Sequence, residues 1–372
     1  MMTNNIEVPA PGEIIRDELE ARGWTQRDLA YVLGVPEQAV NLIAAGKRGI
    51  SADMAKALAD AFGVPAEFFM NLQRAYDLSR AEQPDPGVAR KARLQSCYPV
   101  REMIKRGWLA DSSADALETQ MARFFGVPTI DDVPHLAYAA KKTHYDKFPP
   151  SQLAWLFRVK QIAGRLIVPK YSEKSLREAL PVLRTLMTDP TDVRRVPRIL
   201  NDCGIRFVLV ERLPGAKIDG VCFWLDRNSP VVGMSLRFDR IDNFWFVLGH
   251  ELEHVLRRHG VTDEMVDAEI EGEEANDKDL PEDEKIANAA ATNFCIPKAK
   301  MDSWIARKNP FFSEVDLLGF ARTQNVHPGI VAGQLRNRLK KYQLFAKHLV
   351  KIRQSIVMSA VVDGWGQVYP VN

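Results

Sequence analysis

Two histidines and one carboxylate, with a particular spacing, are the strongest chemical signal in this 372-residue chain. Residues 244–256 form an apolar run with the pattern His-Glu-x-x-His at His250, Glu251 and His254. In a helix, residues four apart project from one face, about one turn above each other. The two imidazoles can then bind one zinc ion, while Glu251, about 100° further round, can act as general base on a water molecule.

A tetrahedral catalytic zinc needs a third protein ligand and one open position. The Ala-rich run 284–297 predicts a second helix, on which Glu284 and Asn288 share a face because they are four residues apart. Glu284 is the candidate third ligand, and Asn288 the candidate hydrogen-bond partner of a ligand histidine. Residues 263–284 contain twelve carboxylates, so another of them could bind the metal in place of Glu284.

Strand patterns precede the histidine helix and predict a small antiparallel sheet. Three apolar runs rich in β-branched residues cover 205–210, 220–225 and 231–236, and turn residues at 226–230 join the last two into a hairpin. An edge strand of such a sheet can hold an extended peptide beside the metal by strand addition.

This part of the chain resembles the ImmA/IrrE family of zinc metallopeptidases in three signatures: His250-Glu251-x-x-His254, Glu284-x-x-Ala287-Asn288 and Ile296-Pro297. The resemblance implies an α+β, gluzincin-like domain that binds Zn²⁺ through His250, His254 and Glu284. It also implies that Glu251 is the catalytic base. One position departs from the family pattern, because Glu253 stands before the second histidine, where glycine or another small residue is frequent.

The N-terminal residues 9–78 predict five short helices with clear start and stop signals. Thr25 is a good N-cap for the second helix, Gly34 ends it, and Pro36 begins the third. The second and third helices are joined by the short turn Gly34-Val35 and therefore form a helix-turn-helix, with 36–45 as the recognition helix.

The same region resembles the Cro/C1-type (XRE) helix-turn-helix family through three signatures: Thr25-Gln26-Arg27-Asp28-Leu29-Ala30, Leu33-Gly34-Val35 and Gly46-Lys47-Arg48. Its ending, residues 69–78, is similar to the HigA antitoxin branch. The resemblance implies a lambda-repressor-like DNA-binding domain. Polar side chains of the recognition helix are expected at base edges, since Gln and Asn can bond adenine bidentately: Glu37, Gln38 and Asn41. Four others are expected at phosphates: Gln26, Arg27, Lys47 and Arg48.

Charge gives this N-terminal region a second interpretation. Residues 1–80 carry eight Lys or Arg against eleven Asp or Glu, a net charge of −3. A DNA-binding domain of this composition must gather its cations on one face and will bind weakly at high salt, whereas the alternative is a helical module that docks protein. Domains of this kind bind two-fold operators as dimers, so a homodimer is expected.

The whole chain is predicted to be a multidomain, mainly α protein. A linker is expected at 79–97, a helical middle region at 98–201, the α+β domain at 202–342, and a tail with few signals at 343–372. His327, which precedes a helix that begins with proline, either stabilises an oxyanion near the metal or caps that helix.

Composition indicates a globular protein without a membrane segment. Hydrophobic residues make up 46% and charged residues 26%, and no apolar run reaches the ~20 residues that cross a bilayer. With no signal peptide at the polar start, the expected location is the cytoplasm. Four dispersed cysteines without CxxC spacing are expected to be reduced.

These features lead to one main hypothesis. It is a regulator that binds operator DNA and carries a zinc endopeptidase, whose substrate is the chain itself, a repressor or a partner toxin. The alternative is a HigA-like antitoxin and autorepressor, or a stress regulator, whose zinc domain binds a partner or ligand without proteolysis. A third hypothesis is a metal-free structural relic.

Overall fold

The structure is a computed structural model that describes residues 8–132, 149–259, 281–364 and 367–368. The chain divides into two compact units, Met1–Asp85 and Pro86–Asn372. Within the described ranges, none of the helices combines the length and apolar character that a membrane crossing requires.

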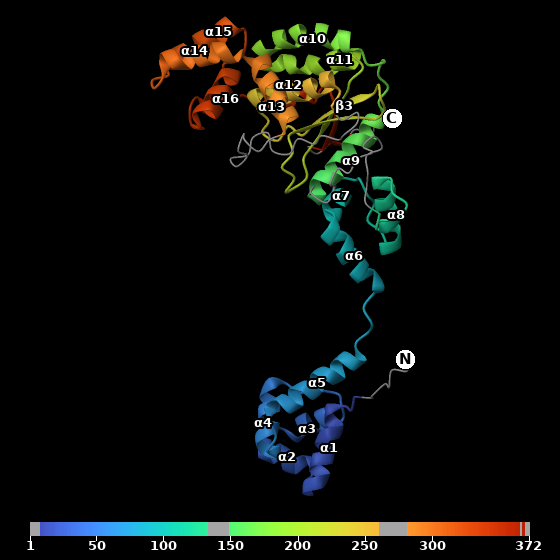
Figure 1. Ribbon diagram of the computed structural model, residues 1–372. Coiled ribbons are helices and arrows are strands. Elements are labelled where there is room, and N and C mark those ends of the chain that lie inside the picture. Colours follow the sequence, from blue (N-terminus) through green and yellow to red (C-terminus); the bar gives the residue numbers. More distant parts are fainter. Residues whose placement is uncertain (1–7, 133–148, 260–280, 365–366, 369–372) are drawn as a thin grey trace. The chain divides into compact units, whose positions relative to one another are not determined.

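The N-terminal unit contains the five helices expected from the sequence (Figure 1): α1 (Pro11–Arg22), α2 (Gln26–Leu33), α3 (Glu37–Ala44), α4 (Ala52–Phe62) and α5 (Ala66–Arg80). Thr25 caps α2 in a reciprocal capping box, since its backbone N–H donates to Asp28 and its hydroxyl accepts from the backbone N–H of Asp28. Gly34 ends α2 with a φ of 65°, a left-handed conformation that suits glycine.

The helix α1 contacts the C-terminal end of α3 and fixes its position. Arg16 donates a 2.7 Å hydrogen bond to the carbonyl oxygen of Ala44, at the end of α3. The start of α1 approaches the same point so closely that a Cβ atom at Gly12 would lie 2.3 Å from the carbonyl oxygen of Ile43. Val40 and Ile43 point inward from α3 into the core of this unit.

The second unit surrounds one sheet with helices: α6 (Pro86–Cys97), α7 (Val100–Lys105), α8 (Ala114–Phe125), α9 (Pro150–Arg165), α10 (Glu173–Thr185), α11 (Val196–Asp202), α12 (Ile241–Arg257), α13 (Glu282–Cys295), α14 (Lys298–Lys308), α15 (Glu314–Gln324), α16 (Pro328–Leu339) and α17 (Arg353–Ile356). The range expected as a linker consists of the end of α5, the connection 81–85 and the helix α6, whose Leu94 is buried. The described parts of the middle region, 98–132 and 149–201, are mostly helical, as expected from the sequence.

The sheet has the order β2-β3-β1-β4-β5: β1 (Arg206–Val210), β2 (Gly220–Trp224), β3 (Pro230–Met234), β4 (Val361–Gly364) and β5 (Gln367–Val368). The predicted β2–β3 hairpin is antiparallel, with Cys222 opposite Val232. The prediction of a wholly antiparallel sheet is wrong, because β1 pairs in parallel with both β3 and β4, so the sheet is mixed. The strand β4 comes from the C-terminal tail, and its pairing with β1 was not predicted from the sequence.

Side-chain alternation along the strands gives three layers. Phe207 and Leu209 of β1 join the core shared with α10, α11 and α12, whereas Val208 and Val210 join the core shared with α9. In Figure 1, α10, α11 and α12 lie on one side of the strands and α9 on the other. This packing places α12 directly on the face of β2 and β3.

Candidate metal centre and DNA interface

The two histidines of α12 meet a carboxylate of α13 in the interior of the second unit. His250 and His254 are 0% and 1% exposed, and their Nε2 atoms lie 2.9 Å apart. The carboxylate of Glu284 places one oxygen 3.2 Å from Nε2 of His250 and the other 3.7 Å from Nε2 of His254. The structure therefore brings together the three residues predicted as ligands.

The donor atoms of this cluster suit zinc in kind and in spacing. Bonds of about 2.0–2.2 Å in a tetrahedron place ligand atoms roughly 3.3–3.5 Å apart, and the observed distances of 2.9, 3.2 and 3.7 Å bracket that spacing. In the part of the chain that the structure describes, these residues form the one group of three or more His, Cys, Asp or Glu side chains placed to hold a metal ion.

Small residues allow α12 and α13 to approach each other. A Cβ atom at Gly249 would lie 2.8 Å from the ring of Phe294 and 3.4 Å from Cα of Ala291. Ala287 and Ala291 are fully buried on the facing side of α13. The Ala-rich face of α13 thus brings Glu284 within reach of the histidines.

Asn288 lies beside His250, the first of the two candidate ligand histidines. Its Oδ1 atom lies 3.1 Å from Nδ1 of His250. An N–H at Nδ1 that donates to this oxygen leaves the lone pair of Nε2 directed at the cluster, which is the tautomer that binds a metal.

Glu251 lies between α12 and the edge strand β2. It is fully buried, and a Cβ atom at Gly220 would lie 2.1 Å from its Oε1 atom. Only glycine therefore fits at this point of β2 while the carboxylate keeps its place. Glu253, which departs from the family pattern, forms a 2.6 Å ion pair with Arg257 one turn further along α12.

His327 is not placed at the cluster and acts as the N-cap of α16. Its Nδ1 atom accepts a 3.0 Å hydrogen bond from the backbone N–H of Gly329, and its own backbone N–H donates to the carbonyl of Met187. Gly329 packs against Ile241, nine residues before His250, which is about 13 Å along a helix. Of the two roles considered for His327, the structure shows the cap. The other carboxylates considered as ligands, from Asp263 to Asp279, lie outside the described residues.

His259 is a neighbour of the cluster that the sequence did not predict. Its Nδ1 atom lies 2.9 Å from Nδ1 of His254, although the two residues are five positions apart and therefore lie on different faces of a regular helix. Arg258, at a φ of 59°, reverses the backbone at the end of α12 and turns the next side chain back. Arginine is not a typical residue for this conformation, so the sequence contained no signal for the reversal.

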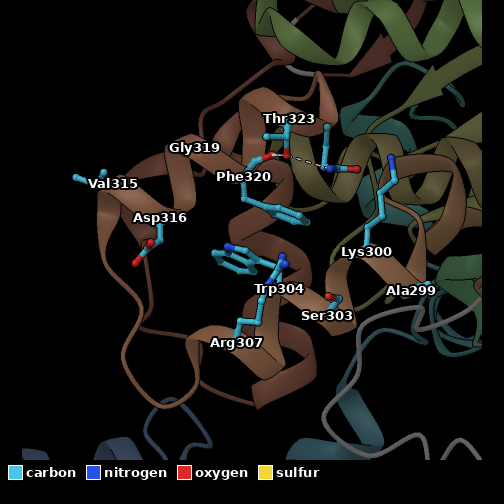
Figure 2. A pocket seen from close by; sticks show the side chains of 11 residues that line it. Ala299, Lys300, Ser303, Trp304, Arg307, Val315, Asp316, Gly319, Phe320 and Thr323 are labelled. Atoms are coloured by element: carbon cyan, nitrogen blue, oxygen red, sulfur yellow. Dashed lines mark hydrogen bonds between the residues drawn. The ribbon is translucent and has the colours of Figure 1, made fainter.

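A groove of about 540 Å³ lies elsewhere in this unit, between α14 and α15 (Figure 2). Trp304 and Phe320 are stacked in it with ring centroids 4.7 Å apart, and Lys300 and Arg307 line it from α14. None of the three cluster residues lines this groove.

In the N-terminal unit, the residues expected at base edges share one helix. Glu37, Gln38 and Asn41 are exposed on α3, and Arg27, Lys47 and Arg48 are exposed around it. Gln26 is half-buried at the first position of α2. The helix α3 therefore presents a polar surface while its apolar side chains remain in the core.

Comparison with known proteins gives matches to the N-terminal part of the chain. The helix-turn-helix family matches residues 15–69. Virulence-associated protein I of Dichelobacter nodosus is 45% identical over 85 residues, which cover 22% of this chain and 79% of that protein. The uncharacterized HTH-type transcriptional regulator YddM of Escherichia coli is 28% identical over 75 residues, which cover 20% and 80%.

Among solved structures, the Pseudomonas aeruginosa antitoxin HigA with higBA promoter is 44% identical and covers 20% of this chain and 80% of its own, with a TM-score of 0.19. The family match spans α2 and α3 and the short turn between them, the two helices predicted to form the motif. Through its N-terminal unit, the chain belongs to the helix-turn-helix family of DNA-binding regulators.

Proposed function

We propose that this protein is a transcription regulator that binds operator DNA through α3 and carries a zinc metallopeptidase-like domain of the ImmA/IrrE type in its second unit. The observation that supports the second part most directly is the convergence of His250, His254 and Glu284, with Glu251 beside them. A bound zinc ion would supply a Lewis acid, which lowers the pKa of water and polarises a carbonyl group.

The protein's own residues would perform the proton transfers. Glu251 is the general base that accepts a proton from the attacking water and then passes it to the leaving amine. Its burial against Gly220 keeps the carboxylate in one position, as proton transfer at a fixed site requires. Asn288 holds His250 in the metal-binding tautomer.

The strand β2 is the proposed docking edge for the substrate. It lies at the end of the strand order, and its Gly220 contacts Glu251. An extended peptide that adds to this edge through backbone hydrogen bonds would run past the base. The proposed substrate is a protein: the chain itself, a repressor or a partner toxin.

DNA binding would use the exposed polar face of α3. Gln38 and Asn41 can donate and accept at adenine edges in the major groove, while Lys47 and Arg48 neutralise phosphates. A homodimer would match a two-fold operator. Exposed apolar residues of α5, Phe68 at 46% and Leu78 at 68% exposure, are available for self-association.

The Glu251→Gln variant tests the proteolytic part of the proposal. Since Glu251 is not one of the three ligand residues, the variant is expected to retain zinc and lose cleavage. The purified wild type and variant are incubated with a bacterial protein extract, and newly formed peptide N-termini are identified by mass spectrometry. New N-termini that appear with the wild type but not with the Glu251→Gln variant support the proposal. Equal cleavage by the variant would remove Glu251 from the mechanism, and no cleavage by either protein would leave a domain that binds without turnover.

A further inference from the structure

We infer that His259 is a positioning residue of the metal centre, which fixes the tautomer and ring orientation of His254. This inference rests on the proposed binding of zinc. His259 lies outside the family signatures, in the turn that follows α12.

The contact between the two rings determines where their protons lie. Two Nδ1 atoms 2.9 Å apart form a hydrogen bond only if one carries the proton and the other offers a lone pair. Nε2 of His254 faces Nε2 of His250 and the carboxylate of Glu284, so it must keep its lone pair to bind a metal ion. The proton of His254 therefore resides on Nδ1 and is donated to Nδ1 of His259.

The arrangement extends from His259 to Asp283. With Nδ1 of His259 acting as acceptor, its proton resides on Nε2, which lies 3.5 Å from Oδ1 of Asp283. Asp283 is next to Glu284 at the start of α13, so both helices contribute to the arrangement. Each ligand histidine then has an acceptor at its Nδ1 atom: Asn288 for His250, and His259 for His254.

The backbone around His259 is fastened to the sheet, unlike that of a free surface histidine. Its carbonyl oxygen accepts a 2.9 Å hydrogen bond from the indole N–H of Trp224, in β2, and its N–H donates to the carbonyl of His254. The guanidinium of Arg258 lies 4.9 Å from the ring centroid of Trp224 and donates to the carbonyl of Arg227. These contacts hold the imidazole at 17% exposure beside His254.

Three substitutions separate this role from a general effect on folding. Loss of an outer partner of a metal-bound histidine typically weakens metal binding about 10- to 100-fold, so His259→Ala is expected to raise the Kd for zinc by that factor. His259→Asn places Oδ1 where Nδ1 stood and is expected to restore most of the affinity. His348→Ala is the matched control, because His348 is paired with Glu314 and makes no contact with the cluster.

The experiment is a competition titration of the full-length apoprotein with zinc and a chromophoric chelator, with the unfolding temperature of each apoprotein as a check on folding. The wild type, His348→Ala and His259→Asn are expected to bind zinc with similar affinity. His259→Ala is expected to bind zinc more weakly than all three. Unchanged affinity in His259→Ala, or equal losses in the Ala and Asn variants, would overturn the inference while wild-type binding stands. A wild-type chain with no measurable zinc affinity would instead overturn the proposed function on which the inference rests.

Discussion

The position of α3 depends on a glycine of α1, and Gly12→Ala is the substitution that tests this. The added Cβ atom would lie 2.3 Å from the carbonyl oxygen of Ile43 and 2.7 Å from that of Ala44, whereas ordinary contact begins at 3.4 Å. The helices must therefore separate by about 1 Å at this point. Both neighbours are backbone atoms, which cannot rotate away as the end of a side chain can.

The expected cost follows from two opposed effects. Overpacking of this kind costs about 1–3 kcal/mol, and replacing glycine in a helix returns at most about 1 kcal/mol. A net loss of about 1–2 kcal/mol corresponds to a fall of about 5–15 °C in the unfolding temperature of a domain of this size. Because the clash is at the end of α3, DNA affinity should also fall at temperatures where the domain is still folded.

Differential scanning calorimetry of the full-length chain measures the first effect, since the two units should unfold in separate transitions. Gly49→Ala is the matched control in the same unit, because the atoms nearest to its Cβ atom would belong to the side chain of Gln73, at an ordinary contact distance of 3.4 Å. The second effect is measured by titrating DNA from upstream of the protein's own gene. A Gly12→Ala variant that unfolds and binds DNA like Gly49→Ala would refute this account of how α3 is positioned.

Three further predictions concern charge, pH and zinc. Lys47→Ala should weaken binding to operator and unrelated DNA alike and reduce the slope of log affinity against log salt by about 1, whereas a change confined to the operator would indicate a base contact. Burial is the main cause, and the nearby charge of His348 the second, that holds the pKa of His327 below its ordinary 6.5. The stabilisation of the folded state by the neutral His327 cap is therefore complete above pH 6.5 and is lost as the pH falls through the folded-state pKa. The stability of His327→Asn, which can cap without titrating, should depend less on pH between 7 and 5 in thermal unfolding, and an unchanged dependence would contradict this. Zinc at about 100 times its Kd should add about 2.7 kcal/mol to the second unit and, with an unfolding entropy of about 600 cal/mol/K, raise that calorimetric transition by about 4–5 °C. An equal shift of both transitions would contradict a site confined to that unit.

The helices could be predicted well because their signals are local. Thr25 and Gly34 start and end α2 through their own hydrogen bonds and backbone conformation. That His250 and His254 share one face of α12, and Glu284 and Asn288 one face of α13, was also predictable, since residues four apart lie on the same side of a helix. The convergence of the two helices depends on Gly249 and Ala291, which the Ala-rich pattern indicated in part.

The pairing of β4 with β1 and the placement of His259 could not be predicted, because they depend on contacts that the local sequence pattern does not specify. Val361 pairs with Val208 across more than 150 residues, and no pattern in either strand specifies that neighbour or its parallel direction. His259 reaches His254 only because Arg258 adopts a left-handed conformation that its residue type does not favour. Trp224, which stabilises that turn, belongs to a strand whose apolar pattern shows burial but not the hydrogen bond made by the indole.

The proposed function requires that three side chains from two helices, His250, His254 and Glu284, hold one zinc ion. Its most direct test is the metal content of the purified chain, measured by mass spectrometry after dialysis against metal-free buffer, alongside His250→Ala and Glu284→Gln. About one zinc per chain is expected in the wild type and far less in both variants. A wild type with no more zinc than His250→Ala, or a Glu284→Gln variant that remains fully loaded, would contradict the account.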